Sequence, residues 1–363
     1  MVNQTPDKET IMRSEELTSH QPDTLKQDFS KFINFQQAKV AGLLPATFVA
    51  PLIVVWELTK LCNLRCLHCY NNSGDMANHS DLSDDVLLDI AQQLVDIKVV
   101  SVCLSGGEPM IRKNVFFSIA QLLKRNGILL STITNGSLVT SDSVKELEKY
   151  FYGIQVSIDG AKPETHDFIR SRNGSFEKAI EAIKLLSNSN INELHVAFVA
   201  NSYNYLEFGE LVDSLATYQK IKYIQTQTIV FSGRATENNE LILSNDQHRE
   251  FLEIIAEKKA QYKNNIHIIY NDPTMHIRKM LRGEEPNYVC QIMADGNMAV
   301  NQWVPIVTGN INDDRILNIW NKNMSNYWLD KRIQNALLNF ETINESGINC
   351  KRYIDPFLNL EDL

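Results

Sequence analysis

The sequence lacks an apolar run long enough to cross a membrane. No stretch approaches the roughly eighteen apolar residues that a spanning helix requires, and the longest apolar runs have the length of buried strands. The first residues, MVNQTPDKETIMRSEELTSH, are polar and contain no apolar segment of the secretory type. We therefore expect a cytoplasmic protein with no membrane partner.

A surplus of basic residues is also missing. The formal net charge is −9, from 35 Lys and Arg against 44 Asp and Glu. Nucleic acids attract proteins with basic surfaces, so we expect no nucleic-acid partner. Of the 6 cysteines, three share one short segment and the others are scattered. This is unlike an evenly paired disulfide framework and is typical of a reducing, cytosolic compartment.

What the sequence does contain, from about residue 50, is a regular alternation. Apolar runs rich in β-branched residues alternate with amphipathic stretches. The runs span residues 52–58, 99–104, 128–133, 153–158, 194–200 and 223–230. Helices are expected at 83–97, 114–124, from 141 onward, and at 176–186, 206–218 and 246–262. Six β-then-α units predict parallel strands with right-handed crossovers. The fold class is therefore α/β, either barrel or open sheet, with the reactive edge at the C-terminal ends of the strands.

The alternation also divides the chain of 363 residues, which is long enough for one large domain or a large domain with a small one. Residues 1–48 are expected to be a polar tail and 49–240 the α/β domain. Residues 241–363 are expected to be a helical linker followed by a small α+β extension. Within it, 285–320 predicts short strands with turns at Asp295-Gly296 and Gly309-Asn310.

The central motif is Cys62-Asn-Leu-Arg-Cys66-Leu-His-Cys69, in the loop after the first expected strand. Three thiolates on a tight loop can hold three corners of a cubic iron–sulfur cluster. No fourth cysteine is near, so one iron would be open to another ligand. One alternative is zinc, which usually takes four ligands in paired sets and would need His68 in an awkward position. The other is a set of buried structural cysteines.

This C-x3-C-x2-C spacing resembles the signature of the radical SAM superfamily, and the resemblance extends over about residues 50–235. It implies a partial (β/α)6 barrel with a [4Fe–4S] cluster on Cys62, Cys66 and Cys69. It further implies that S-adenosylmethionine (SAM) chelates the open iron and is cleaved to a 5′-deoxyadenosyl radical. The protein would orient these groups and exclude water. The electron would come from a donor such as flavodoxin or ferredoxin.

The resemblance also implies contacts to SAM. His68 occupies the position of an aromatic residue that stacks beside the adenine. Gly106-Gly107-Glu108-Pro109 resembles the family's GGEP element, in which the carboxylate receives the methionine amino group. The glycines would let the backbone approach a ligand closely. Taken alone, this motif could simply be a turn.

Two further strand ends, and Arg170 beyond the second of them, carry expected SAM contacts. Thr134 and Asn135 follow the third run and suit ribose hydroxyls, and Ser157 ends the fourth and suits the ribose or the carboxylate. The alternative is turn chemistry and helix capping, which applies equally to Asp159. Arg170 resembles an arginine that clamps the methionine carboxylate. The alternative for Arg170 is a surface salt bridge.

Two other features carry weaker expectations. Ser232-Gly233-Arg234-Ala235 ends the sixth run and resembles a Gly-Arg turn of peptide-modifying members, where its role is less fixed. Cys103 lies inside an apolar run and is expected to be a small buried thiol.

The C-terminal region resembles the SPASM or twitch extension of peptide-modifying enzymes. Gly309-Asn310-Ile311 and the Leu317-x-x-Ile-Trp320 pattern are present. Asn301 stands where a second cysteine is usual, so only Cys290 and Cys350 remain for an auxiliary cluster. We expect a degenerate subdomain without a cluster. The alternative is a cluster held by these two cysteines and unusual ligands.

These features lead to three hypotheses for function. The first is a radical SAM enzyme that modifies a peptide, with a separate protein to bind the leader peptide or direct binding by the barrel. The second is the same chemistry on a small molecule such as a tetrapyrrole precursor. The third is a non-catalytic partner that binds cluster and SAM; the retained Cys62, Cys66, Cys69 and Glu108 argue against it.

Iron counting tests the cysteine assignment. After anaerobic reconstitution, the wild-type chain should hold about four irons, and a variant with Cys62, Cys66 and Cys69 all changed to Ala should hold none, because these thiolates are the protein ligands. Iron and sulfide analysis measures both. Iron that remains in the variant would place an auxiliary cluster on Cys290 and Cys350.

Overall fold

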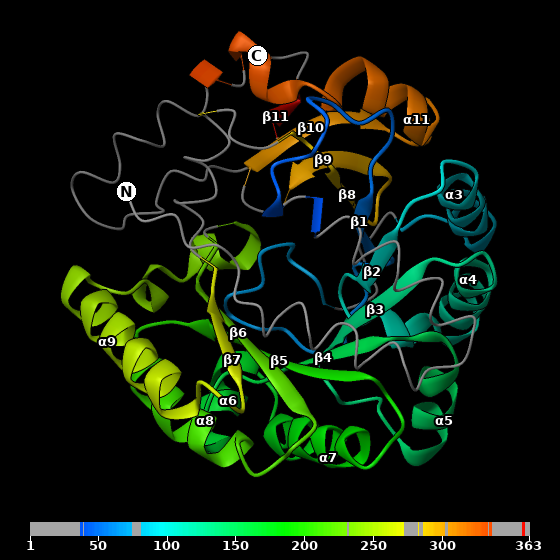
Figure 1. Ribbon diagram of the computed structural model, residues 1–363. Coiled ribbons are helices and arrows are strands. Elements are labelled where there is room, and N and C mark those ends of the chain that lie inside the picture. Colours follow the sequence, from blue (N-terminus) through cyan, green and yellow to red (C-terminus); the bar gives the residue numbers. More distant parts are fainter. Residues whose placement is uncertain are drawn as a thin grey trace.

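The structure, a computed structural model, describes residues 37–38, 40–74, 81–230, 232–271, 282, 286–301, 304–332, 334–335 and 358–359. Its strands form one sheet in the order β11-β10-β9-β8-β1-β2-β3-β4-β5-β6-β7. In Figure 1 the strands β1 to β7 curve into an arc, and the C-terminal strands continue it on the far side of β1. The expected tail, residues 1–48, falls largely outside the described residues.

The predicted α/β barrel is confirmed. Its strands are β1 (Ile53–Glu57), β2 (Ser101–Ser105), β3 (Leu129–Thr134), β4 (Gly153–Ser157), β5 (Glu193–Ala200), β6 (Ile221–Thr228) and β7 (His267–Tyr270). Each pairs with the next in parallel register. The first six coincide with the six apolar runs. The short strand β7 was not predicted.

Helices cover the outer face of the arc (Figure 1). They are α3 (Asp84–Asp96), α4 (Lys113–Arg125), α5 (Ser141–Tyr150), α6 (Pro163–Arg170), α7 (Ser175–Ser187), α8 (Phe208–Leu215) and α9 (Asn245–Tyr262). All but α6 were predicted. Their starts follow capping chemistry: Ser83 accepts a hydrogen bond from the backbone of Val86, and Ser244 forms a capping box with Gln247.

The two faces of the barrel strands differ in burial. Along β5 the residues alternate between fully buried and half-buried, as do those of β6 from Tyr223 onward. The buried set, such as Val196 and Ile224, packs in the main hydrophobic core with the helices. Successive side chains of a strand point to opposite faces, so the half-buried set lines the inner face of the arc. This inner face lies below the strand ends that carry the expected site.

The C-terminal extension continues the same sheet. β8 (Val289–Ile292) pairs in parallel with β1, and β9 (Asn297–Asn301) and β10 (Val304–Asn310) follow antiparallel to their neighbours. The short strand β11 (Leu358–Asn359) pairs with β10. The turn at Asp295-Gly296 is confirmed, with Gly296 at φ 87°. The expected turn at Gly309-Asn310 was misplaced: these residues end β10, and the turn follows them.

The extension and the barrel share one hydrophobic core. After β10, α11 (Ile316–Ile319) leads to Trp320, which is fully buried and donates its indole N–H to the Phe48 carbonyl at 2.8 Å. Cys290 belongs to the same core, beside Val54 in the strand register. Its thiol therefore lies on the helix-covered face of the sheet. Cys350 lies outside the described residues.

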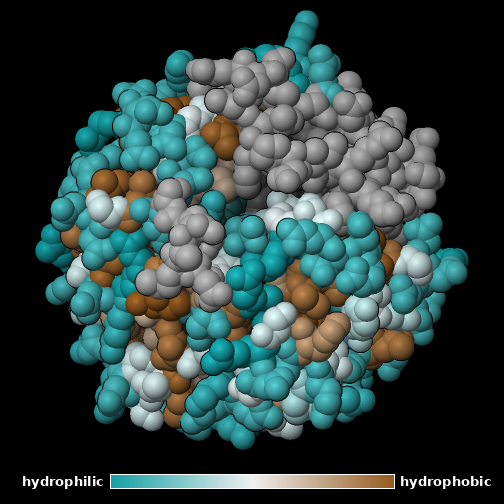
Figure 2. Space-filling model, turned by 180° about the vertical axis from the view of Figure 1, so that it is seen from behind, coloured by the Kyte–Doolittle hydropathy of each residue, from teal (hydrophilic) through white to brown (hydrophobic). Residues whose placement is uncertain are grey.

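The outer surface is mostly hydrophilic, with scattered apolar side chains on the face shown in Figure 2. Among the described residues, no helix combines the length and the hydropathy needed to cross a bilayer.

Because the core is shared, Trp320→Ala should destabilise the barrel as well as the extension. We expect a loss of about 3–5 kcal/mol from the cavity, seen as one shifted transition in urea unfolding followed by far-ultraviolet circular dichroism. Leu317→Ala, on the same helix and 37% exposed, serves as the matched control and should cost far less. Two separate transitions, with the larger one unchanged, would contradict a shared core.

Candidate functional site

The cysteine loop leaves the C-terminal end of β1 and closes on itself. Its two ends are joined by backbone hydrogen bonds from Cys62 to the Gly74 carbonyl at 3.0 Å and from Gly74 to the Lys60 carbonyl at 3.1 Å. Between these ties the chain is irregular, which brings three cysteines onto one short arc. Cys66 is buried, and Cys62 and Cys69 are half-buried.

Nitrogen donors are directed at all three sulfur atoms. The backbone N–H of Leu64 donates to Cys62 Sγ at 3.5 Å, and that of Ser73 donates to Cys69 Sγ at 3.3 Å. The third donor is Arg170, whose Nη1 lies 3.7 Å from Cys66 Sγ. Donors of this kind stabilise thiolates and tune the metal that they hold.

The Gly-Gly-Glu turn packs against the chain that leads into this loop. Gly107 donates to the Thr59 carbonyl at 2.7 Å, and Glu108 N donates to the Leu61 carbonyl at 2.8 Å. A Cβ at Gly107 would lie 2.1 Å from the Leu61 carbonyl oxygen, and one at Gly106, where φ is 125°, would lie 2.5 Å from that of Thr59. No side chain fits there. The close approach that glycine permits is thus made to the protein's own backbone.

Glu108 is fully buried and ties this turn to the end of β3. Its carboxylate accepts from Thr134 Oγ1 at 2.9 Å and from the backbone N–H of Asn135 at 2.8 Å. Burial raises the pKa of Glu108 to about 7, and these hydrogen bonds oppose the rise only in part. The structure therefore brings together three of the predicted site residues through Glu108.

Asn135, which donates to Glu108 through its backbone, also contacts the cysteine loop through its side chain. Its Nδ2 donates to Asn63 Oδ1 at 3.0 Å and lies 3.8 Å from Cys62 Sγ. Its side-chain oxygen accepts from Ser137 N at 2.9 Å. The residue is thus partly engaged in turn chemistry, as the alternative interpretation expected, and it also reaches the first cysteine.

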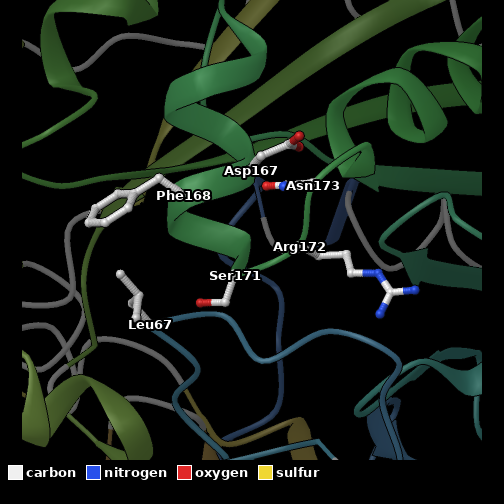
Figure 3. A pocket seen from close by; sticks show the side chains of 6 residues that line it. All are labelled: Leu67, Asp167, Phe168, Ser171, Arg172 and Asn173. Carbon is white, nitrogen blue, oxygen red and sulfur yellow. The ribbon is translucent and has the colours of Figure 1, made fainter.

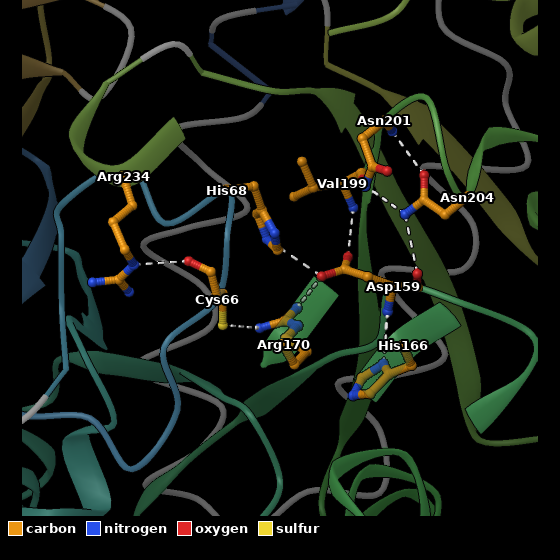
Figure 4. Close-up of polar contacts among 9 residues, drawn as sticks. All are labelled: Cys66, His68, Asp159, His166, Arg170, Val199, Asn201, Asn204 and Arg234. Carbon is orange, nitrogen blue, oxygen red and sulfur yellow. Dashed lines mark hydrogen bonds and ion pairs between the residues drawn. The ribbon is translucent and has the colours of Figure 1, made fainter. Parts of the chain in front are cut away.

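A second cluster joins the end of β4 to the loop (Figure 4). Asp159 is fully buried, and its Oδ2 lies 2.7 Å from Arg170 Nη2 and 3.3 Å from His68 Nε2. Burial alone would raise the pKa of Asp159, but the Arg170 guanidinium and then His68 bring that pKa below its ordinary value. Burial lowers the pKa of His68 to about 4, so the imidazole is neutral. The structure thus brings the predicted residues His68 and Arg170 together around Asp159, with Arg170 in a buried ion pair.

Several polar atoms of this second cluster have no hydrogen-bond partner among the described residues. They are His68 Nδ1, Arg170 Nε and Asp159 Oδ2, the last of which forms its ion pair without a well-aligned hydrogen bond. Buried polar atoms are nearly always satisfied in native proteins. The lack of a partner at both His68 Nδ1 and Arg170 Nε, in one cluster, therefore indicates that a polar ligand fits between the loop and the end of β4.

Ser157, the remaining predicted residue, ends β4 and is half-buried on the inner face. It lies one strand end away from Thr134 and two residues before Asp159. On the other flank of α6, a pocket of about 700 Å³ is lined by Leu67 of the cysteine loop together with Asp167, Phe168, Ser171, Arg172 and Asn173 (Figure 3).

Comparison with known proteins identifies this arrangement. Residues 56–215 match the sequence model of the Radical SAM superfamily, a range that contains the cysteine loop, the glycine turn and both polar clusters. Residues 56–215 thus belong to the radical SAM superfamily. The resemblance of the cysteine motif is therefore confirmed.

Curated relatives in this superfamily have different activities. The mycofactocin maturase MftC of Mycolicibacterium smegmatis is 32% identical over 170 residues, which cover 47% of this chain and 43% of MftC. The AdoMet-dependent heme synthase of Methanosarcina barkeri is 27% identical over 292 residues, covering 75% of this chain and 82% of that protein. The chain thus spans less than half of MftC and most of the heme synthase.

Solved structures support the fold. Streptococcus suis SuiB, in a crystal structure bound to S-adenosylmethionine, superposes with a TM-score of 0.63 at 17% identity, covering 92% of this chain and 78% of SuiB. The covered share includes the C-terminal extension, which confirms a partial barrel that continues into antiparallel strands.

Membership of the radical SAM superfamily implies a [4Fe–4S] cluster and SAM as cofactors, and the residues present fit both. Cys62, Cys66 and Cys69 share one arc with N–H donors at each sulfur. No three His, Cys, Asp or Glu side chains of the described residues converge as ligands of a single metal ion do. A cubic cluster instead takes one protein thiolate on each of three irons. The atoms without a hydrogen-bond partner around Asp159 fit a polar ligand.

Sequence reasoning missed a third buried acid in the radical SAM site. Glu57, the last residue of β1, is fully buried and accepts from Tyr70 Oη at 2.6 Å and Gln291 Nε2 at 2.7 Å. Asn71 Nδ2 donates to it at 3.3 Å, and Asn71 Oδ1 lies 3.0 Å from Cys69 Sγ. The available signal was an acid inside the apolar run LIVVWEL, where charged residues are rare.

The raised pKa of Glu108 predicts a pH-dependent stability. With a folded pKa of about 7 against an ordinary 4.5, the folded state keeps this proton while the unfolded state loses it, so the contribution of Glu108 to stability falls as pH rises between these values. Glu108→Gln removes this titration. Relative to wild type, the variant should gain roughly 2 kcal/mol of unfolding free energy between pH 5 and pH 8.

Urea unfolding of both apoproteins at the two pH values measures this gain. Glu253→Gln, at an exposed position of α9, is the control and should show no comparable change. A difference between Glu108→Gln and wild type that is the same at pH 5 and pH 8 would show that Glu108 titrates normally.

Proposed function

We propose that this chain is a radical SAM enzyme that cleaves SAM reductively and modifies a peptide, as in the maturation of ribosomally made peptides or of peptide-derived cofactors. The observation that carries the peptide assignment is the chemistry of the inner face of the barrel. Below the strand ends this face presents amides and hydroxyls, including Ser131, Gln155, Gln225 and Gln227. Such groups can pair with the amides of a peptide main chain.

Charge on the inner face favours a peptide over a tetrapyrrole precursor. None of the inner-face positions of β1 to β7 is Lys or Arg, and two of them, Glu57 and Glu193, are acids. A tetrapyrrole precursor carries several carboxylates, which proteins bind with arginine and lysine. On this face such a molecule would meet no Lys or Arg, and the only inner-face side chains that can become cations are His195 and His267.

The site residues have proposed roles that follow from their positions. Cys62, Cys66 and Cys69 hold the cluster. His68, Thr134, Asn135, Ser157 and Arg170 surround the space for SAM. When bound, the reduced cluster and SAM supply the radical that abstracts a hydrogen atom from the substrate.

Glu108 has a proposed role that differs from the one its motif suggests. Its carboxylate already accepts from Thr134 and Asn135, so it orders the β3 end of the site. Gly106 and Gly107 fix the start of the cysteine loop in the same way. In this arrangement, backbone groups around Glu108, and not its carboxylate, bind the amino group of SAM.

The proposal includes partners. Reduction of the cluster requires a one-electron donor of the flavodoxin or ferredoxin kind. A leader peptide would be bound by a separate protein or by the barrel. MftC and the SuiB complex with the precursor peptide SuiA are the relatives that support a peptide substrate. The proposed units remain a barrel of residues 49–240 and an extension of residues 241–363, joined in one sheet.

The second candidate is a tetrapyrrole substrate. It is favoured by the length of the alignment with the AdoMet-dependent heme synthase, which covers 82% of that protein. The two candidates share the barrel, the cluster and SAM, and they differ in whether the molecule on the inner face is a peptide.

Deuterium transfer separates them. Reconstituted protein, SAM and dithionite are incubated with a low-molecular-weight extract of the native host grown in deuterated medium, and 5′-deoxyadenosine is analysed by mass spectrometry. Because the radical removes an atom from the substrate, deuterium should enter 5′-deoxyadenosine. Treating the extract with a protease that is then inactivated should abolish this labelling.

Three controls define the outcomes. The Cys62, Cys66 and Cys69 triple-Ala variant should form no 5′-deoxyadenosine. Labelling that survives protease treatment, and that added unlabelled iron coproporphyrin suppresses, would establish the tetrapyrrole alternative. Absence of any 5′-deoxyadenosine from the cluster-loaded wild type would leave the non-catalytic partner as the function.

A further inference from the structure

Arg234 connects the far side of the barrel to the cysteine loop. It lies in the helical turn Gly233–Glu237 that follows β6, whereas the loop follows β1, and four strands separate the two in the sheet. The Arg234 side chain is 8% exposed. Figure 4 shows it reaching the loop from the side opposite Arg170, which approaches the sulfur of Cys66.

The contacts of Arg234 are concentrated on the segment that carries two cluster ligands. Its Nε donates to the Cys66 carbonyl at 3.0 Å, and its backbone N–H donates to the Cys69 carbonyl at 3.0 Å. Nη1 donates to Asn72 Oδ1 at 2.8 Å, and Nη2 donates to the Ser73 carbonyl at 2.5 Å. One residue thus holds the main chain of both Cys66 and Cys69.

The neighbours of Arg234 fit the same purpose. Gly233 has φ 56°, and a Cβ there would lie 2.6 Å from the Cys69 carbonyl oxygen and 2.5 Å from that of Tyr70. Asn238 Nδ2 donates to the Leu67 carbonyl at 3.2 Å and to the Arg234 carbonyl at 2.8 Å. The turn after β6 is therefore shaped to lie directly on the loop.

The hydrogen bonds from Arg234 satisfy carbonyl groups of the cysteine loop that have no partner in a helix or a sheet. The loop is neither helix nor strand between Cys66 and Ser73, so its carbonyls lack the partners of a helix or sheet. A buried acceptor without a partner is costly, and a charged donor makes a stronger bond than a neutral one. The planar guanidinium meets three acceptors in fixed directions, which a lysine cannot reproduce.

We propose that Arg234 is the positioning residue of the cluster: it fixes the backbone of Cys66 and Cys69 so that their sulfur atoms stand at the spacing that the cluster requires. This inference rests on the proposed function only in that the loop holds a cluster. Arg234 acts through the main chain of the two ligand residues. It is therefore distinct from Arg170, which reaches a sulfur atom directly.

The test compares Arg234→Gln and Arg234→Lys with wild type and with Arg125→Gln. Arg125 is an exposed arginine in the last turn of α4, so its replacement removes the same charge away from the site. Four properties are measured: iron and sulfide per chain after reconstitution, the electron paramagnetic resonance spectrum of the reduced cluster, its midpoint potential, and the rate at which a chelator removes iron.

Arg234→Gln should hold less than half of the wild-type iron and lose it about tenfold faster, because three acceptors of the loop lose their donor. Its spectrum should broaden and its potential should become more negative, since a nearby positive charge favours the reduced cluster. Arg234→Lys should keep most of the potential and recover part of the iron. Arg125→Gln should match wild type in all four properties.

Wild-type iron, spectrum, potential and chelator rate in Arg234→Gln would overturn the proposal. If that variant fails to fold, Asn238→Ala and Gly233→Ala replace it: both should speed iron release, and release at the wild-type rate from both would overturn the proposal equally. Absence of a cluster from the wild-type chain would refute the proposed function itself, whereas a loaded wild type beside an unaffected Arg234→Gln would refute only the role of Arg234.

Discussion

The structure depends on one constraint, which is that the cysteine loop must stay irregular and yet be buried. An irregular buried segment cannot satisfy its own backbone groups, so other parts of the chain must supply the partners. The Thr59 carbonyl accepts a hydrogen bond from the glycine turn after β2, and the Leu67 N–H donates to the Ile169 carbonyl of α6. The Cys66 carbonyl accepts from Arg234 after β6. The barrel brings these elements to one edge, and this edge is where parallel strands place functional residues.

Three buried acids at strand ends are satisfied in two different ways. Asp159 has the cation Arg170 beside it, which keeps it ionised in spite of its burial. Glu108 has only neutral donors, so burial dominates and its pKa rises. Glu57 also has neutral donors, from the loop and from the extension. A buried carboxyl group is therefore a counter-ion to arginine at Asp159, whereas at Glu108 and Glu57 it links chain segments through hydrogen bonds from neutral donors.

The parts that could be predicted from the sequence are those set by local pattern. Apolar runs predicted β1 to β6, and the cysteine spacing predicted the cluster loop. β7 was not predicted because its four residues are fewer than those of the apolar runs that marked the other strands. The Arg234 contacts could not be predicted, because they join residues 168 positions apart, and only the curved sheet brings them together. The buried pairing of Arg170 with Asp159 was also not predicted, because sequence spacing does not reveal burial, and a surface salt bridge was the expected alternative.

The place of β1 in the sheet has a consequence for the order of assembly. One edge of β1 pairs with β2, and the other pairs with β8, which is synthesised much later. Glu57 likewise accepts a hydrogen bond from Gln291, which follows it by 234 positions. During synthesis the strand that precedes the cysteines thus keeps an open edge until most of the chain has left the ribosome. Unpaired strand edges invite wrong pairing. The strand that leads into the cysteine loop is therefore paired on both edges only after β8 has been synthesised.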